Sequence, residues 1–245
     1  MTQTSVSDSS KASTSRSLPA RIVGVLFAPR ATYADVAARP RALGVLTAVV
    51  LVAAGGVFLF MSTDVGKNAF LDQQVQQREA FGRPLTDAQY DRLEAMVPYA
   101  PYFGAIFQIV SLPLLGAVIA GIALAVFNAV LGGDGTFKQV FAVVAHSGVV
   151  LSVAQIFGLP LAYARQTLAS ATNLGVFAPF LDESSFAART LGAIDLFIIW
   201  WIISLAIGLG VLYRKRTGPI ATTMMIVYVA IGIVIAAVKT AMSGA

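Results

Sequence analysis

The sequence lacks cysteine and carries little charge. Its 245 residues include no Cys and a single His, and Asp, Glu, Lys and Arg together make up 12% of the chain. The missing cysteines exclude disulfides, thiolate metal sites and cysteine nucleophiles, and His146 alone does not make a histidine metal site. A soluble domain carries roughly 25% charged residues. We therefore expect the lipid bilayer, rather than water, to surround most of this chain.

Enzyme signatures are also missing. The sequence has no phosphate-binding glycine loop ending in Lys-Ser/Thr, no HExxH and no GxSxG, so we expect neither catalysis nor a cofactor. The net charge is +5, but the Lys and Arg side chains flank apolar segments instead of clustering on one patch. This distribution favours anionic lipid headgroups as the partner and predicts no nucleic-acid binding.

What the chain has in abundance is long apolar runs, since 57% of its residues are hydrophobic. Each run reaches the ~20 residues that an α-helix needs to cross ~30 Å of hydrocarbon. The sequence therefore predicts an all-α fold, a polytopic transmembrane bundle within residues 42–242. The five expected spans are about 42–61, 102–131, 137–164, 191–213 and 219–238.

The positive-inside rule orients the bundle. The N-terminal region, the 132–138 turn and the 214–216 connection hold ten Lys and Arg against three acids. The opposite side, including the 62–101 loop, holds seven against eight. We therefore expect a cytoplasmic N-terminus and an outside C-terminus.

Three further segments complete the predicted domain organisation. Residues 1–18 are a Ser/Thr-rich tail that we expect to be disordered. Residues 19–41 combine apolar faces with arginines, which is typical of a helix lying at the membrane surface. Packing underneath the bundle is the alternative. Within this segment, Thr32 and Asp35 are expected to cap a second short helix. The 62–101 loop, outside the cytoplasm, is expected to be helical.

Small residues recur at every fourth position of the second span. The ridge consists of Ala117, Gly121, Ala125 and Ala129. Such spacing lets a neighbouring helix approach closely. It predicts helix packing, either within the chain or against another membrane protein or a second copy.

Polar side chains at membrane depth form the candidate functional site, because they are rare inside the bilayer. The candidates are Asn128 on the second span and Gln139, His146 and Gln155 on the third. A neutral His146 bonded to a neighbouring helix is one interpretation, and proton coupling or substrate binding is the other. Asp195, Trp200 and Trp201 are expected to anchor the outer end of the fourth span at the interface.

The order of three motifs resembles prokaryotic members of the Ypt-interacting protein (YIP) domain family. These are RIVGVLFAPRATY at 21–33, GGDGTFKQ at 132–139 running into Ala-His-Ser at 145–147, and IDLFIIW at 194–200. The resemblance covers roughly 20–240 and implies a five-span, non-enzymatic protein of the bacterial cytoplasmic (inner) membrane. Eukaryotic relatives associate with small GTPases of vesicle traffic and with one another. Those relatives carry a long cytoplasmic N-terminal domain that this sequence lacks, so we do not expect the resemblance to extend to a GTPase partner.

Two functional hypotheses follow. The first is an adaptor or scaffold that binds other membrane proteins, or itself as a homo-oligomer, or that organises the membrane. The second is a transporter or channel for a lipid or small solute that uses the polar groups of the second and third spans. The arginine-rich entry segment, the small-residue ridge and the missing catalytic motifs favour the first.

Overall fold

The structure is a computed structural model that describes residues 16–182 and 184–242. Within these residues all regular secondary structure is helical, apart from one isolated bridge between Asn173 and Asp195. The expected all-α fold is confirmed. The prediction of a disordered tail falls mostly on residues 1–15, which lie outside the described residues.

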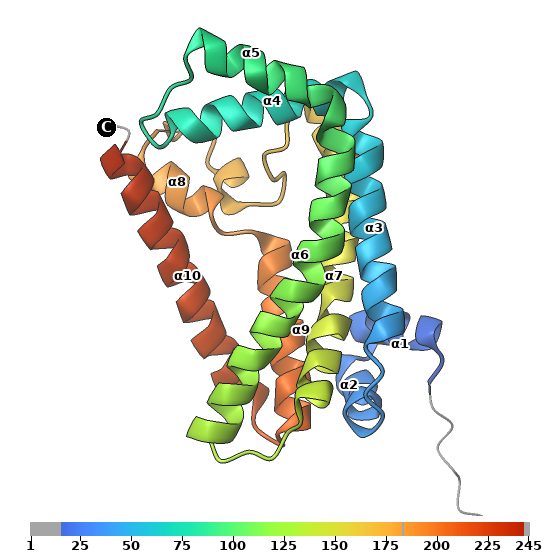
Figure 1. Cartoon of the computed structure of the whole chain (residues 1–245). Coiled ribbons are helices and arrows are strands. Elements are labelled where there is room, and N and C mark those ends of the chain that lie inside the picture. The colour runs from blue at the N-terminus through green and yellow to red at the C-terminus, as the bar shows by residue number, and fades with distance from the viewer. Residues whose placement is uncertain (1–15, 183, 243–245) are drawn as a thin grey trace, which may run out of the picture.

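The helices in chain order are α1 (Leu18–Phe27), α2 (Pro29–Ala38), α3 (Leu43–Met61), α4 (Asp64–Glu79), α5 (Asp87–Met96), η1 (Val97–Tyr99), α6 (Ala100–Leu124), η2 (Ala125–Val130), α7 (Phe137–Arg165), η3 (Leu174–Phe177), α8 (Phe186–Gly192), α9 (Leu196–Leu212) and α10 (Thr217–Met242). The long helices run alongside one another, with α1 and α2 at one end of the bundle and α4 and α5 at the other (Figure 1).

Four helical segments are long and apolar enough to cross a membrane. They are α3, α7, α10 and the continuous helical run Asp87–Val130, of which α6 is the main part. The fifth apolar helix in the bundle, α9, has 17 residues, which is about 26 Å at 1.5 Å per residue. It is shorter than the expected 191–213 stretch because the chain folds into α8 and a cap before Leu196. The polytopic helical bundle is therefore present, with α9 as its shortest apolar member.

The core of the bundle is built around α7. This helix packs on α3, α6 and α9, and its buried residues form an almost unbroken run along its first half, Val140 and Ala142 to Val150. A helix that is buried on all sides needs no amphipathic pattern. Its start is fixed by a capping box in which Thr136 and Gln139 bond each other's backbone amides.

The N-terminal helices pack across one end of the bundle, α1 against α7 and α2 against α9. The apolar residues Val23 and Phe27 still remain exposed, at 55% and 83%. The segment thus has one face on the bundle and one face free. The expected helix start at Thr32 is wrong: α2 begins at Pro29, whose fixed φ suits a first helical position, and the Thr32 hydroxyl donates to Ala28 O inside the helix.

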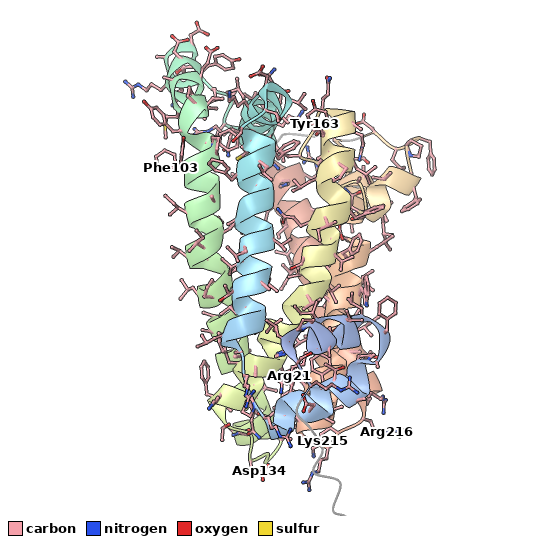
Figure 2. The ribbon with its side chains drawn as sticks, turned by 90° about the vertical axis from the view of Figure 1, so that its right-hand side faces the viewer. Arg21, Phe103, Asp134, Tyr163, Lys215 and Arg216 are labelled. Carbon is pink, nitrogen blue, oxygen red and sulfur yellow. The ribbon has the colours of Figure 1, made fainter. Side chains whose placement is uncertain are left out.

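The loop between the first two long helices folds into α4 and α5, which lie across the other end of the bundle (Figure 1). Thr63 caps α4 by accepting from Gly66 N, and Gln89 caps α5 by accepting from Thr86 N. The helix start predicted after Thr86 is confirmed. Charged side chains lie at the ends of the bundle. Figure 2 shows four of them, Arg21, Asp134, Lys215 and Arg216, at the α1–α2 end.

Two helices are exposed over most of their apolar length. In the helical run that contains α6, 6% of the most apolar stretch is buried, and in α10 11%, against 50% in α7. α10 packs mainly on α9 and α8, and α6 on α3 and α7. Both helices therefore present broad apolar faces to their surroundings, which in a membrane are lipid or other proteins.

Candidate functional site

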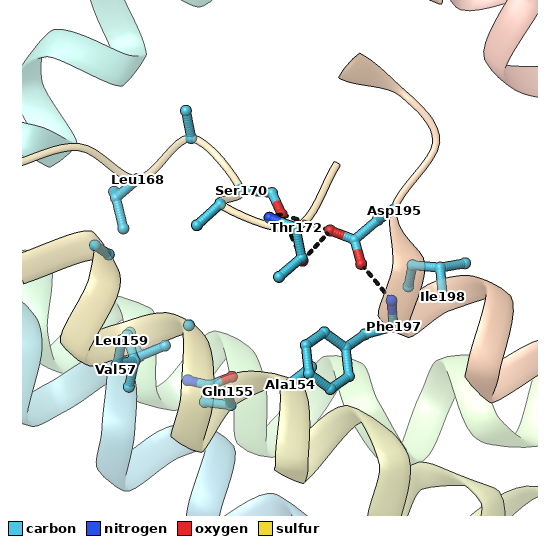
Figure 3. A pocket seen from close by; sticks show the side chains of 14 residues that line it. Val57, Ala154, Gln155, Leu159, Leu168, Ser170, Thr172, Asp195, Phe197 and Ile198 are labelled. Carbon is cyan, nitrogen blue, oxygen red and sulfur yellow. Dashed lines mark hydrogen bonds between the residues drawn. The ribbon is translucent and has the colours of Figure 1, made fainter. Parts of the chain in front are cut away.

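A cavity of about 390 Å³ opens near the α4–α5 end of α7. Its floor comes from α7, from Ala154 to Ala162, and its walls from Val57 on α3 and the start of α9. The connection after α7, residues 168–172, closes one side, as Figure 3 shows. The walls are mostly apolar, and the polar lining groups are Gln155, Ser170, Thr172 and Asp195.

Asp195 is the hub of this region. Its carboxylate caps α9 by accepting from Phe197 N at 2.8 Å, and it also accepts from Thr172 Oγ1 at 2.7 Å and from Ser170 Oγ. Its own amide donates to the Tyr228 hydroxyl on α10, which donates in turn to Ala193 O. One residue thereby joins the 168–173 connection, α9 and α10. Asp195 was expected as an interface anchor, and the structure gives it these three attachments.

The two tryptophans that follow Asp195 lie in different surroundings. Trp200 is 37% exposed on the outside of the bundle, a position suited to the aromatic belt. Trp201 packs against the core and donates from Nε1 to Ser147 Oγ at 3.0 Å. Trp200 thus faces the surroundings, whereas Trp201 holds α9 to α7.

The four candidate polar residues at membrane depth do not meet at one place. Asn128 donates to Gly135 O at 2.7 Å, Gln139 donates to Ala37 O at 3.1 Å, and Gln155 donates to Ala53 O at 3.2 Å. His146 is fully buried, and its Nδ1 lies 2.7 Å from Ala142 O one turn earlier. Gln139 and Gln155 thereby join α7 to α2 and to α3, whereas Asn128 holds the turn before α7 and His146 bonds within α7.

Two of these residues keep a polar atom without a partner in the described part of the chain. The atoms are His146 Nε2 and Asn128 Oδ1. Because Nδ1 of His146 faces a carbonyl oxygen, Nδ1 carries a hydrogen, and in the neutral imidazole Nε2 is then an acceptor. His146 lines neither the 390 Å³ cavity nor a second one between α8 and α10, and no group of His, Asp and Glu in the described residues is suited to a metal ion.

A buried polar cluster at the α1–α2 end was not singled out from the sequence. Arg21 is 3% exposed and forms an ion pair with Asp35 at 2.8 Å, and Tyr33 shares a 2.7 Å hydrogen bond with Ser204 on α9. Burial raises the pKa of the Tyr33 hydroxyl well above its ordinary value, and the bond to Ser204 lowers it in part. The feature of the sequence that could have indicated this ion pair is Asp35, the one acid among the arginines of residues 16–41.

The small-residue ridge of the second span lies at the outer surface of the bundle. Ala117 and Gly121 are half-buried, and Ala125 and Ala129 are exposed. A Cβ added at Gly121 would meet no heavy atom within 4 Å outside its own stretch of helix in the described structure. At Gly208 on α9, by contrast, an added Cβ would lie 2.5 Å from Val143 and 3.0 Å from the Tyr33 ring. Gly208 serves internal packing, and Gly121 faces open space.

The long apolar helices and their packing around α7 define an integral membrane protein in which α6 and α10 expose broad apolar faces. Comparison with known protein families identifies the class of membrane protein more closely. The Yip1 domain model matches residues 23–238, and the chain belongs to this family. The family resemblance of the three motifs is thereby confirmed. No curated protein and no solved structure matches the chain significantly.

Proposed function

We propose that this protein is a non-enzymatic adaptor or scaffold of the bacterial cytoplasmic membrane, which binds other membrane proteins or a second copy of itself through the open face of α6. The observation that carries the proposal is the unoccupied ridge around Gly121, where no neighbouring helix of residues 16–182 and 184–242 fills the space. Large apolar neighbours such as Leu114, Val118 and Ile122 are at least 50% exposed on the same helix.

The ridge is suited to a helix partner for a physical reason. Lipid tails are as apolar as leucine side chains, so helices associate in membranes through close packing rather than through the hydrophobic effect. Small residues at every fourth position leave a shallow groove in which a second helix gains many contacts. In this chain α3 and α7 pack on α6, and the ridge remains available on its open side.

The alternative, a transporter or channel for a lipid or small solute, has less support. Asn128, Gln139, His146 and Gln155 each hold a backbone carbonyl and do not line one path. The 390 Å³ cavity includes Gln155 but lies toward one end of α7. Flux through reconstituted protein that is abolished by His146→Ala would favour the transporter over the adaptor.

The proposed orientation places the α1–α2 end in the cytoplasm and the α4–α5 end outside. The basic residues at the α1–α2 end support it, among them Lys215 and Arg216 in the α9–α10 connection (Figure 2). Cytoplasmic connections carry an excess of Lys and Arg in membrane proteins. The cysteine-labelling experiment in the Discussion tests this orientation.

The adaptor proposal is tested by bulky substitutions on the ridge. Tagged wild type, Gly121→Leu and Ala125→Leu are purified in a mild detergent from native membranes after lipid-phase cross-linking. We expect a defined assembly, with a partner or a second copy, that the two variants lose. Gly55→Leu is the matched control, because Gly55 on α3 also has no heavy atom within 4 Å of an added Cβ but lies off the ridge. Assemblies that survive both ridge variants unchanged would refute the proposal.

A further inference from the structure

A second cavity, of about 250 Å³, lies where α8 meets the last turns of α10. It is lined by Arg189, Gly192, Ala193, Ile235, Ala236 and Lys239. Two of these six residues are cations, and none is an acid. This cavity is separate from the Asp195 cavity, with which it shares no lining residue.

Contacts across the junction hold the two cations in place. Arg189 reaches from α8 to α10, where its Nη1 lies 3.4 Å from Thr240 Oγ1. Lys239 lies over the Phe81 ring, with its Nζ 5.6 Å from the ring centroid. Both side chains are half-buried. Arg189 also lies near Asp182: hydrogen bonds from the Ser184 hydroxyl and amide lower the pKa of the Asp182 carboxyl, and the charge of Arg189 adds to this effect.

The cavity also borders the lipid-facing surface of α10. Ile235 lines it and is 44% exposed, whereas the next residue, Ala236, which also lines it, is 1% exposed. One turn to either side, Ile231 and Val238 are 54% and 43% exposed. An apolar strip therefore runs along α10 up to the two cations near its C-terminal end, where the helix reaches the membrane–water interface.

Two cations near the C-terminal end of α10, with an apolar strip leading to them, are arranged as the phosphate and acyl chains of a phospholipid require. A phosphate diester accepts charge-assisted hydrogen bonds from Arg and Lys, and acyl chains lie against apolar helix surface. Small residues at 192 and 193 leave room for the headgroup between the two side chains. We propose that Arg189 and Lys239 form a binding site for the phosphate of a phospholipid, with its chains along Ile231, Ile235 and Val238. This site is independent of the proposed adaptor role of α6.

The test measures lipid binding to the delipidated full-length protein in detergent by native mass spectrometry. The probes are phosphatidylglycerol, diacylglycerol with the same chains, and glycerol phosphate. We expect wild type to bind phosphatidylglycerol at least about tenfold more tightly than diacylglycerol, and the Arg189→Gln/Lys239→Gln variant to lose about tenfold in affinity, since a charge-assisted bond is worth at least one factor of ten. Glycerol phosphate is expected not to displace the lipid.

Arg92→Gln is the matched control, because Arg92 is an exposed arginine on α5 at the same end of the bundle. It removes charge without touching the cavity, and we expect less than about a twofold change in affinity. Equal losses in Arg92→Gln and the cavity variants, or undiminished binding in the double variant, would overturn the site. Displacement by glycerol phosphate as effective as that by the lipid would overturn the assignment to a lipid.

Arg189→Lys and the single Lys239→Gln variant separate binding from folding. Arg189→Lys keeps the cation and is expected to keep most of the affinity for phosphatidylglycerol. Thermal unfolding of each variant without lipid establishes that it is folded. Loss of binding in Arg189→Lys, with an unchanged unfolding midpoint and an unchanged Lys239→Gln affinity, would contradict a phosphate held by both charges.

Discussion

The Tyr33 hydroxyl and the Ser204 hydroxyl share a 2.7 Å hydrogen bond that joins α2 to the middle of α9 across 171 positions of sequence. Tyr33 is fully buried and Ser204 is 3% exposed. A buried bond between helices so far apart in the chain fixes how the N-terminal segment sits on the bundle. The segment is thus part of the folded core, although it lies at the end of the spanning helices.

Replacing Tyr33 with Phe is expected to destabilise the protein by about 1–3 kcal/mol, because Ser204 Oγ is left buried without its partner. Unfolding in mixed detergent, followed by circular dichroism, measures the loss. Ser204→Ala is expected to have a similar effect, and the double variant less than the sum of the two. Additive effects would show that the bond does not couple the helices.

This bond also marks the limit of what the sequence reveals. The helices of the bundle were predictable because each apolar run has a length set by the bilayer; the third expected span, 137–164, for example, nearly coincides with α7 (Phe137–Arg165). The partner of Tyr33 was not predictable, since no local pattern relates two residues 171 positions apart. Polar residues such as Gln155 invited a functional interpretation because a sequence does not show which carbonyl an amide bonds.

The burial of Arg21 was hidden for the same reason. Residues 19–41 carry several arginines, and nothing local distinguishes Arg21 from its exposed neighbour Arg30. In the structure Arg21 donates to Asp35 at 2.8 Å and to Arg39 O at 3.3 Å, on the side of α1 that faces the bundle. The apolar face with flanking arginines therefore predicted a helix on the membrane surface. In the structure, one of these arginines is buried and links α1 to α2 through its ion pair with Asp35.

Arg21→Met is expected to destabilise the protein by about 3 kcal/mol or more, because it leaves the Asp35 carboxylate without its buried counter-ion. Arg30→Met is the matched control and is expected to change stability by less than about 0.5 kcal/mol. The double variant Arg21→Met/Asp35→Leu is expected to recover part of the loss. The readout is unfolding in mixed detergent, and equal stabilities of the two single variants would contradict a buried ion pair.

Alanine at two glycines is expected to change stability in opposite directions. At Gly208 the added methyl group would lie 2.5 Å from Val143 Cγ1, and overpacking of this kind costs about 1–3 kcal/mol. At Gly121 the space is open, and alanine is expected to stabilise the helix by up to about 1 kcal/mol through its higher propensity. Thermal unfolding of the purified variants decides the signs. A destabilised Gly121→Ala monomer would mean that the ridge is packed inside the chain.

The orientation of the bundle can be measured because the chain has no native cysteine. Single cysteines at exposed positions report the side: Asp134 and Lys215 at the α1–α2 end, and Gln77 and Ser184 at the other. Gly135 is a poor position, since a Cβ there would lie 2.6 Å from the Tyr213 hydroxyl.

In intact cells an impermeant thiol reagent is expected to label Gln77→Cys and Ser184→Cys, and to reach Asp134→Cys and Lys215→Cys after the membrane is opened. The reverse pattern would place Arg214–Arg216 outside, against the charge bias, and would put the proposed phosphate site in the cytoplasmic leaflet. Labelling of Gln77 and Ser184 on opposite sides would instead show that α6 or α7 does not cross, and labelling of Ser184 and Lys215 on the same side would show that α9 does not cross.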